Sequence, residues 1–230
     1  FSLNRIKWKD LYESEKNIFI HLNPRENSEI LDIGCGCGGL GIALKEKFNI
    51  NSYTGIEINK KASLKAKKMN TKAKIHNGDF LEIDFKKKYD LVVSLSCIDW
   101  NVEFEAMLEK AWKLTKENGT FVISLRLTEF EGINDINHSF QFINYEGKLS
   151  GEKAPYVVLN YEYWLSKIRN MKNLNKVYGY GYYGKPSQTA VTSYKEVCFA
   201  VFSLTKLKKT DSTQSEIEFN LNLPIFFQNM

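Results

Sequence analysis

The chain has 230 residues, of which 43% are hydrophobic and 26% are charged, and its net charge is +5. This length suits one large domain or two small ones, and the hydrophobic content supports a sizeable core. The charge is too small for a strongly basic nucleic-acid-binding domain. The sequence has no apolar run of about 18 residues, so we expect no transmembrane helix.

The first elements alternate between helix and strand. Apolar residues at helical spacing predict a helix over 6–22, which Asn23 and Pro24 end. Residues 30–33 form a short apolar strand, a glycine-dense turn follows, and 42–48 again have a helical pattern. Strand, glycine turn and helix are typical of a site for a nucleotide-like ligand, because glycine lets the backbone approach the ligand and the helix N-terminus offers free N–H groups.

The spacing within the turn narrows the kind of ligand. The glycines stand as Gly34-x-Gly36-x-Gly38, whereas a dinucleotide site has G-x-G-x-x-G. Asp32 lies two residues before the first glycine, where its carboxylate would repel a pyrophosphate and attract a cation. S-adenosylmethionine carries an ammonium and a sulfonium, so its charge fits. A glycine pattern alone is weak evidence for any one ligand.

Two later strands also end in acids. Residues 53–58 form the second strand, and Glu57 follows Gly36 by 21 residues, the spacing expected of a carboxylate that accepts hydrogen bonds from ribose hydroxyls. Residues 73–80 form the third strand, where Asp79 can accept a hydrogen bond from an adenine amino group and Phe80 can lie against the ring. Each acid by itself is equally an ordinary strand-end or turn residue.

The middle of the chain predicts further strands and an insertion. Residues 89–95 and 120–125 form the fourth and fifth strands, with a helix over 102–116 that Asn118 and Gly119 end. The alternation of strands and helices predicts a parallel sheet covered on both faces. Residues 127–159 interrupt it at the carboxyl edge of the sheet, where ligands bind, so we expect a lid over the acceptor.

The last third of the chain predicts a helix over 161–171 and strands over 175–183 and 197–202. Alternating tyrosines in 175–183 form an aromatic face, which is either packing or a stacking wall for a ring. In the tail, strict alternation over 217–223 predicts a strand. We expect residues 216–228 to dock on a sheet edge or on a partner subunit, and the second case would make a homodimer.

The chain resembles the class I S-adenosylmethionine-dependent methyltransferases over about residues 28–126. The matching residues are Asp32 to Gly38, Glu57, Asp79 with Phe80, and Asp90–Ser94. The resemblance implies S-adenosylmethionine as cofactor, with Asp32 near the methionine ammonium, Glu57 on the ribose and Asp79 on the adenine. The further cofactor contacts expected in this family pattern are Gly34, Cys35, Gly36, Gly38, Ile58, Phe80 and Ser94.

The resemblance also implies the fold. We expect an α/β, Rossmann-like architecture with a seven-stranded, mostly parallel sheet, helices on both faces, an antiparallel last strand and a lid insertion after strand 5 at about 127–159. Residues 1–205 would form a single methyltransferase domain, and 206–230 a C-terminal tail.

Four residues are candidates for the acceptor side. Asp99 and His138 are candidate catalytic bases, Trp100 a pocket wall, and Arg126 a group that holds an anionic part of the acceptor. Structural alternatives exist for three of them. Asp99 would cap a helix, His138 would be an ordinary surface histidine, and Arg126 would form an ion pair within the fold.

The expected function is methyl transfer to a small molecule, at a hydroxyl of a sugar, nucleotide sugar or surface-glycan precursor. The glycan preference rests on a loose resemblance of 124–128 and 139–143 to methyltransferases encoded beside bacterial surface-glycan genes. One alternative is an RNA or other nucleic-acid methyltransferase, although 94–97 lacks the Asp/Asn-Pro-Pro-aromatic motif of the enzymes that act on base amino groups. The sequence lacks the glycine spacing of a nicotinamide-dependent oxidoreductase. A non-catalytic module that binds S-adenosylmethionine is a further alternative, because it would have the same donor motifs.

The four cysteines form no C-x-x-C, and the chain has three histidines, so we expect no metal site. We expect free thiols and a cytoplasmic location, a small-molecule acceptor as partner, and contact with neither nucleic acid nor membrane.

Overall fold

A computed structural model describes residues 5–144, 147–208 and 216–224. The helices are α1 (Glu13–Leu22), α2 (Gly39–Phe48), α3 (Lys60–Met69), α4 (Phe104–Leu114) and α5 (Tyr161–Arg169), with short 3-10 helices η1 (Trp8–Asp10) and η2 (Ile98–Trp100). The main-sheet strands are β1 (Glu29–Ile33), β2 (Ser52–Glu57), β3 (Lys74–Asn77), β4 (Tyr89–Ser94), β5 (Thr115–Thr128), β8 (Leu159–Asn160), β9 (Leu174–Gly184), β11 (Val197–Lys206) and β12 (Glu218–Asn222). A second, small sheet contains β6 (Phe140–Ile143), β7 (Glu152–Pro155) and β10 (Ala190–Val191).

The main sheet has the strand order β12-β9-β11-β5-β4-β1-β2-β3, and β8 pairs with β5 beside this path. Strands β1 to β5 are parallel, whereas β11 runs antiparallel between β5 and β9. The predicted Rossmann-like sheet, mostly parallel with one antiparallel strand, is confirmed. The predicted number of seven strands is wrong for the described residues, because β8 and β12 extend the sheet to nine.

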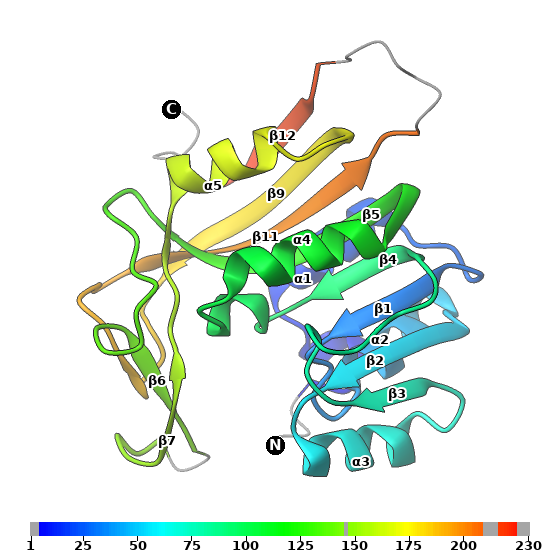
Figure 1. Ribbon diagram of the computed structural model, residues 1–230, viewed down its shortest axis with the longest axis horizontal. Helices are drawn as coiled ribbons and strands as arrows, with labels where there is room; N and C mark the ends of the chain where they lie inside the picture. Colours follow the sequence, from blue (N-terminus) through cyan, green and yellow to red (C-terminus); the bar gives the residue numbers. More distant parts are fainter. Residues whose placement is uncertain (1–4, 145–146, 209–215, 225–230) are drawn as a thin grey trace.

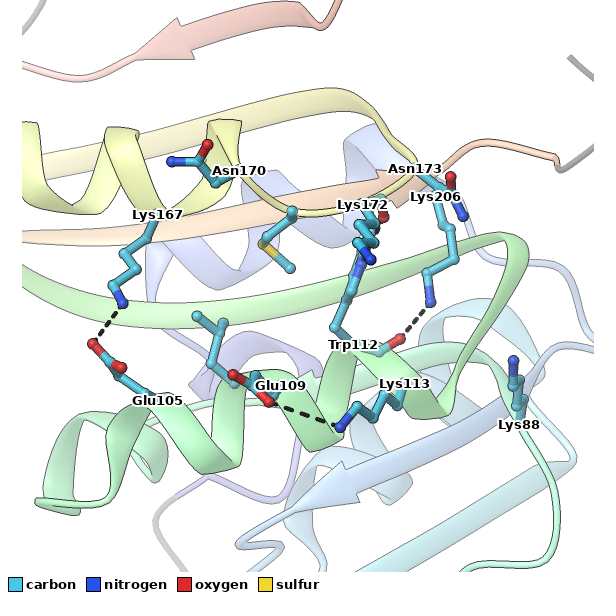
Figure 2. A pocket seen from close by; sticks show the side chains of 12 residues that line it. Lys88, Glu105, Glu109, Trp112, Lys113, Lys167, Asn170, Lys172, Asn173 and Lys206 are labelled. Carbon is cyan, nitrogen blue, oxygen red and sulfur yellow. Dashed lines mark hydrogen bonds and ion pairs between the residues drawn. The ribbon is translucent and has the colours of Figure 1, made fainter. Parts of the chain in front are cut away.

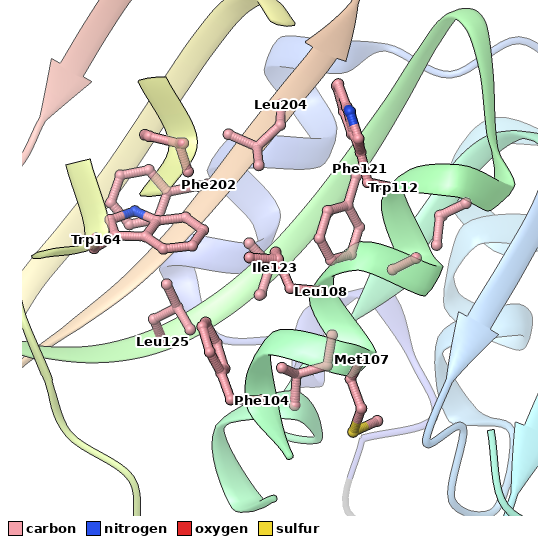
Figure 3. Packing of buried hydrophobic residues seen from close by; sticks show 14 of the residues in the cluster. Phe104, Met107, Leu108, Trp112, Phe121, Ile123, Leu125, Trp164, Phe202 and Leu204 are labelled. Atoms are coloured by element: carbon pink, nitrogen blue, oxygen red, sulfur yellow. The ribbon is translucent and has the colours of Figure 1, made fainter. Parts of the chain in front are cut away.

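Helices cover both faces of this sheet (Figure 1). One face packs against α4 and α5. Figure 3 shows Phe104 of α4 beside Leu125 of β5, Leu108 beside Ile123, and Trp164 of α5 against Phe202 of β11. The other face packs against α1 and α2 in a separate cluster of buried residues. The strands are apolar on both faces because successive side chains point to opposite sides, as a parallel sheet between helices requires.

Two element boundaries differ from the predictions for local reasons. The single helix predicted over 6–22 is divided into η1 and α1, because the Glu15 carboxylate accepts the Tyr12 N–H at 3.0 Å and starts a new helix there. Helix α4 ends at Leu114, before the predicted stop at Asn118. Asn118 instead adopts φ +58° inside β5, where the pairing with β4 jumps from Thr115 to Thr120.

The insertion after β5 carries the small sheet, which stands apart from the main sheet in Figure 1. Strand β7 pairs with β6, and β10 joins them from a later part of the chain. In the tail, β12 lies parallel to β9, so residues 218–222 dock on the edge of their own sheet. Residues 225–228 of the predicted docking segment lie outside the described residues.

Candidate functional site

The glycine turn follows β1 at the carboxyl edge of the sheet. Gly34, Gly36 and Gly38 have φ angles of +72°, +54° and +78°, a region that L-residues rarely adopt. A Cβ atom at Gly34 would lie 2.4 Å from the Cys97 Sγ, whereas one at Gly36 would meet nothing within 4 Å. The turn therefore leaves open space beside Gly36, directly before the N-terminus of α2.

A cleft of about 240 Å³ opens at this turn. Asp32, the turn residues 34–37, and Ser96 beyond β4 line it, and Arg5 lines it from the N-terminal segment. Gly34, Cys35 and Gly36, which sequence analysis proposed as cofactor contacts, all lie in this lining. Arg5 was not predicted, since nothing in its local sequence marks it as a ligand-binding residue.

Asp32 is a buried carboxyl group at the floor of the cleft. Its side chain is 3% exposed and accepts a hydrogen bond from the Tyr53 hydroxyl. Burial raises the pKa of Asp32 to about 7, against the opposing effects of the Tyr53 hydrogen bond and the Arg5 charge. The group is therefore poised between its charged and neutral forms near neutral pH, and a bound cation would favour the charged form.

Glu57 connects the second strand to the glycine turn. One carboxylate oxygen accepts the Gly36 N–H at 2.9 Å, and the other accepts the Asn59 N–H at 2.8 Å. The first of these bonds fixes the turn in the shape that opens the cleft. The predicted spacing from Gly36 thus corresponds to a direct contact, and each oxygen keeps a second lone pair for a ligand.

The other predicted cofactor residues lie in different environments. Asp79 is partly exposed and accepts the Leu81 N–H at 2.8 Å, whereas Ile58 is exposed. Phe80 is 4% exposed and packs in the main core beside the Lys110 ammonium, which leaves little of its ring for a ligand. Ser94 is fully buried, and its hydroxyl accepts the Ile98 N–H at 3.3 Å. The Ser94 hydroxyl therefore stabilises the loop that follows β4.

A second cavity, of about 510 Å³, adjoins the cleft and shares Ser96 with it. Three predicted acceptor-side residues, Asp99, Trp100 and Arg126, line it. His138, the other candidate base, does not: its side chain is 75% exposed in the insertion after β5 and pairs with Asp135 at 2.7 Å. The expectation for His138 is corrected on this geometry, because its ring binds a neighbour three residues away instead of facing the cavity.

Asp99 and Arg126 form a buried ion pair. Arg126 Nη2 lies 3.0 Å from Asp99 Oδ2, and the guanidinium also donates to the Val157 and Asp99 carbonyls at 3.1 and 2.5 Å. The structural alternative for Arg126 is therefore realised, and Asp99 lies in η2 and does not cap α4. Burial raises the pKa of Asp99, against the opposing charge of Arg126.

Two polar atoms in this wall are buried without a hydrogen-bond partner in the described part of the chain. They are Asp99 Oδ1 and the Tyr156 hydroxyl. The Arg126 guanidinium stacks on the Tyr156 ring at 3.8 Å, which places both residues in one cluster. Buried polar atoms without partners are rare, so such a pair in a cavity wall suggests that a ligand satisfies it.

The tyrosines of β9 lie in two different environments. Tyr178 stacks on His21 of α1 at 3.8 Å, and Tyr180 donates to Glu13 of the same helix at 3.3 Å. These two rings pack the helix against the sheet. Tyr182, the third of the alternation, lines the second cavity together with Tyr12.

A larger cavity among the described residues lies elsewhere. It measures about 740 Å³ and runs between α4 and α5, with a lysine-rich rim (Figure 2). Lys88 precedes β4, and Lys206 ends the antiparallel β11, so this groove opens at the amino edge of the parallel strands. Ligands of open α/β sheets bind at the carboxyl edge, and the smaller pair of cavities therefore forms the candidate site.

The model of a family described as a methyltransferase domain matches residues 24–180. The chain belongs to this methyltransferase domain family. The prediction that the chain is a class I S-adenosylmethionine-dependent methyltransferase is thereby confirmed, and so is the prediction that its cofactor is S-adenosylmethionine.

Two individual relatives are also named as methyltransferases. The putative methyltransferase 235L of Invertebrate iridescent virus 6 is 24% identical over 181 residues, 77% of this chain and 68% of that protein. The release factor glutamine methyltransferase of Fusobacterium nucleatum is 30% identical over 133 residues, 55% of this chain but only 34% of that protein. The chain thus spans about a third of the length of the second relative.

Solved structures share the fold. The YcgJ protein of Bacillus subtilis superposes with a TM-score of 0.59 at 11% identity, covering 84% of this methyltransferase and 97% of that chain. The glycopeptide N-methyltransferase MtfA, solved with S-adenosylhomocysteine, has a TM-score of 0.56 at 13% identity, covering 84% and 89%.

Three further findings bear on the composition of the site. Within the described ranges, no three His, Cys, Asp or Glu side chains gather as a metal site would require. All four cysteines are free thiols. None of the helices in the described ranges has both the length and the apolar character that crossing a bilayer would require.

Proposed function

We propose that this methyltransferase binds S-adenosylmethionine in the glycine-turn cleft and methylates a hydroxyl of a small, sugar-sized acceptor in the adjoining cavity. The observation that carries the proposal is the pair of compartments that meet at Ser96, one beside the glycine turn and one lined by aromatic rings. Such an arrangement brings a donor and an acceptor together end to end.

The residues of the cleft, together with two acids outside its lining at or just after the ends of β2 and β3, fit the donor. Asp32 would hold the methionine ammonium, the glycine turn would lie against the donor at the open side of Gly36, Glu57 would accept from the ribose, and Asp79 from the adenine amino group. The raised pKa of Asp32 supports its role, since a bound ammonium would offset the burial of the charge.

The acceptor cavity fits a hydroxyl group. Asp99 Oδ1 needs a hydrogen-bond donor, and the Tyr156 hydroxyl can offer a proton to an acceptor. A substrate hydroxyl supplies both. A carboxylate or phosphate would place its charge beside Asp99, which is unfavourable. The rings of Tyr12, Trp100 and Tyr182 suit the apolar face of a sugar.

The chemistry needs little from the protein besides placement and one proton transfer. The donor, when bound, supplies a methyl group on a sulfonium that is already activated for displacement. Alignment of the acceptor against it can lower the barrier by about 7–11 kcal/mol. Asp99 would take the hydroxyl proton at Oδ1, while Arg126 holds Oδ2 and fixes the carboxyl group in place.

Other expectations remain proposals. Residues 1–205 would act as one methyltransferase domain. A homodimer through the tail would have to form at the outer edge of β12, because its other edge pairs with β9 of the same chain. The free thiols support a cytoplasmic location. Against an RNA acceptor, a cavity of about 510 Å³ holds a small molecule more readily than a strand.

Methyl transfer from labelled S-adenosylmethionine to a panel of sugars, nucleotide sugars, RNA and proteins tests the proposal. We expect label in a sugar-type hydroxyl, and Asp99→Asn to lower kcat by about 10²–10⁴-fold while donor binding is kept. Asp135→Asn, a matched change on the lid surface outside the cavity, is the control. Label in RNA or protein alone, or an Asp99→Asn enzyme of full activity, would contradict the proposal.

A further inference from the structure

The N-terminal segment lies directly on the donor cleft. A Cβ atom at Gly39, in the first turn of α2, would be 2.1 Å from the Arg5 carbonyl oxygen, so the two backbones are in contact. Three residues later, the Trp8 N–H donates to Glu46 at 3.0 Å, and the Trp8 ring meets Phe48 edge-on at 5.4 Å. These contacts fix the segment along α2 and hold Arg5 beside the glycine turn.

The Arg5 guanidinium forms a hydrogen bond along one edge, and its Nε on the other edge has no hydrogen-bond partner among the described residues. Its Nη2 donates to Glu15 Oε1, and the guanidinium lies 4.6 Å above the Tyr12 ring. The Nε atom is buried. A buried donor of a charged group that lacks a partner is costly, which suggests that a ligand in the cleft supplies one.

The charged residues that line the cleft also indicate that Arg5 faces the ligand. Among the described residues that line it, Asp32 and Arg5 are the charged ones. The methionine end of the donor is a zwitterion, and Asp32 can hold only its ammonium. The carboxylate would lie near a second negative charge unless a cation faces it, and in this lining that cation is Arg5.

We propose that Arg5 binds the α-carboxylate of the donor through its Nε edge, and that Glu15 is the positioning residue that holds the guanidinium there. This inference rests on the proposed donor site. Glu15 is 2% exposed, and its second oxygen accepts the Tyr12 N–H at 3.0 Å, so it is itself held at the start of α1. Since Glu15 also lines the acceptor cavity, the ion pair joins the two compartments.

Binding of two ligands separates recognition of the carboxylate from all other effects. S-adenosylhomocysteine carries the amino-acid group, whereas 5′-methylthioadenosine lacks it. Calorimetry should show that Arg5→Met weakens S-adenosylhomocysteine about 10–100-fold and 5′-methylthioadenosine less than about twofold. Arg5→Lys keeps the charge without the planar edge and should be intermediate. Arg25→Met, an exposed arginine outside the cleft, is the control.

The role of Glu15 is tested by a double-mutant cycle. Glu15→Gln should weaken S-adenosylhomocysteine by about threefold or more in the wild-type background and leave it unchanged in the Arg5→Met background. Additive losses would mean that Glu15 acts independently of Arg5. An Arg5→Met loss that is equal for both ligands, or no loss at all, would overturn the inference. A wild-type protein that binds neither ligand would instead remove the proposed function.

Discussion

Replacement of Asp32 by Asn should stabilise the ligand-free methyltransferase above neutral pH. The carboxyl group is 3% exposed, and burial raises its pKa from 3.8 to about 7. Asparagine has nearly the same shape and keeps an oxygen that can accept the Tyr53 hydroxyl. The substitution therefore removes a buried charge and little else.

The sign follows from proton binding. Because the folded-state pKa lies above the unfolded-state value, the folded protein binds more protons between about pH 4 and 7, and its stability falls as the pH rises through this window. A difference of about three pKa units corresponds to about 4 kcal/mol. At pH 8 the wild type bears this whole cost, whereas Asp32→Asn bears none of it.

Thermal unfolding without ligand at pH 5 and pH 8 measures the effect. The gain of up to about 4 kcal/mol at pH 8 would raise Tm by about 8–16 °C for a chain of this size. At pH 5 the difference should fall to about 2 kcal/mol, because folded Asp32 is then mostly protonated while the unfolded chain, with a pKa of 3.8, already ionises it. Asp84→Asn, an exposed carboxylate beside Lys86, should leave the slope above pH 5 unchanged. Parallel curves of Tm against pH for wild type and Asp32→Asn would refute the reasoning.

Three other outcomes follow from the site and the core. Binding of S-adenosylhomocysteine should weaken below about pH 7, by up to about tenfold per pH unit, and this dependence should disappear in Asp32→Asn; calorimetry from pH 5 to 8 checks it, and a flat wild-type profile would exclude Asp32 as the ammonium ligand. His138→Ala should keep full kcat, because its ring is exposed and pairs with Asp135; a loss of more than tenfold would return it to the mechanism. Phe202→Ala should cost about 3–5 kcal/mol in urea unfolding, since its ring is fully buried against Trp164, and a cost below 1 kcal/mol would mean that the core closes around the cavity.

The glycine-turn part of the candidate site was predictable from the sequence because its signals are local. The glycines after β1 need positive φ angles, and Asp32, Glu57 and Asp79 each lie in or directly after a strand. Parallel strands bring their carboxyl ends to one edge, so acids read at successive strand ends meet in space. The antiparallel direction of β11 was expected from the family resemblance, whereas the strand order was not predicted.

The arrangement of the second cavity could not be predicted from the sequence, because it depends on contacts between residues far apart in the chain. Sequence position placed Asp99 and Arg126 near the cavity, but only the tertiary structure joined them as an ion pair and left Asp99 Oδ1 without a partner. It likewise placed the His138 side chain on the surface of the insertion, as the structural alternative for this residue expected.

The sequence by itself determined the elements and the donor turn, since side-chain period and backbone dihedral preference act over a few residues. Tertiary structure alone decided how Arg5 faces Glu15, which of the β9 tyrosines reaches the cavity, and that the tail adds β12 to its own sheet. Each of these depends on how helices and strands pack over long separations, and desolvation and pairing energies, not local propensity, select among the alternatives there.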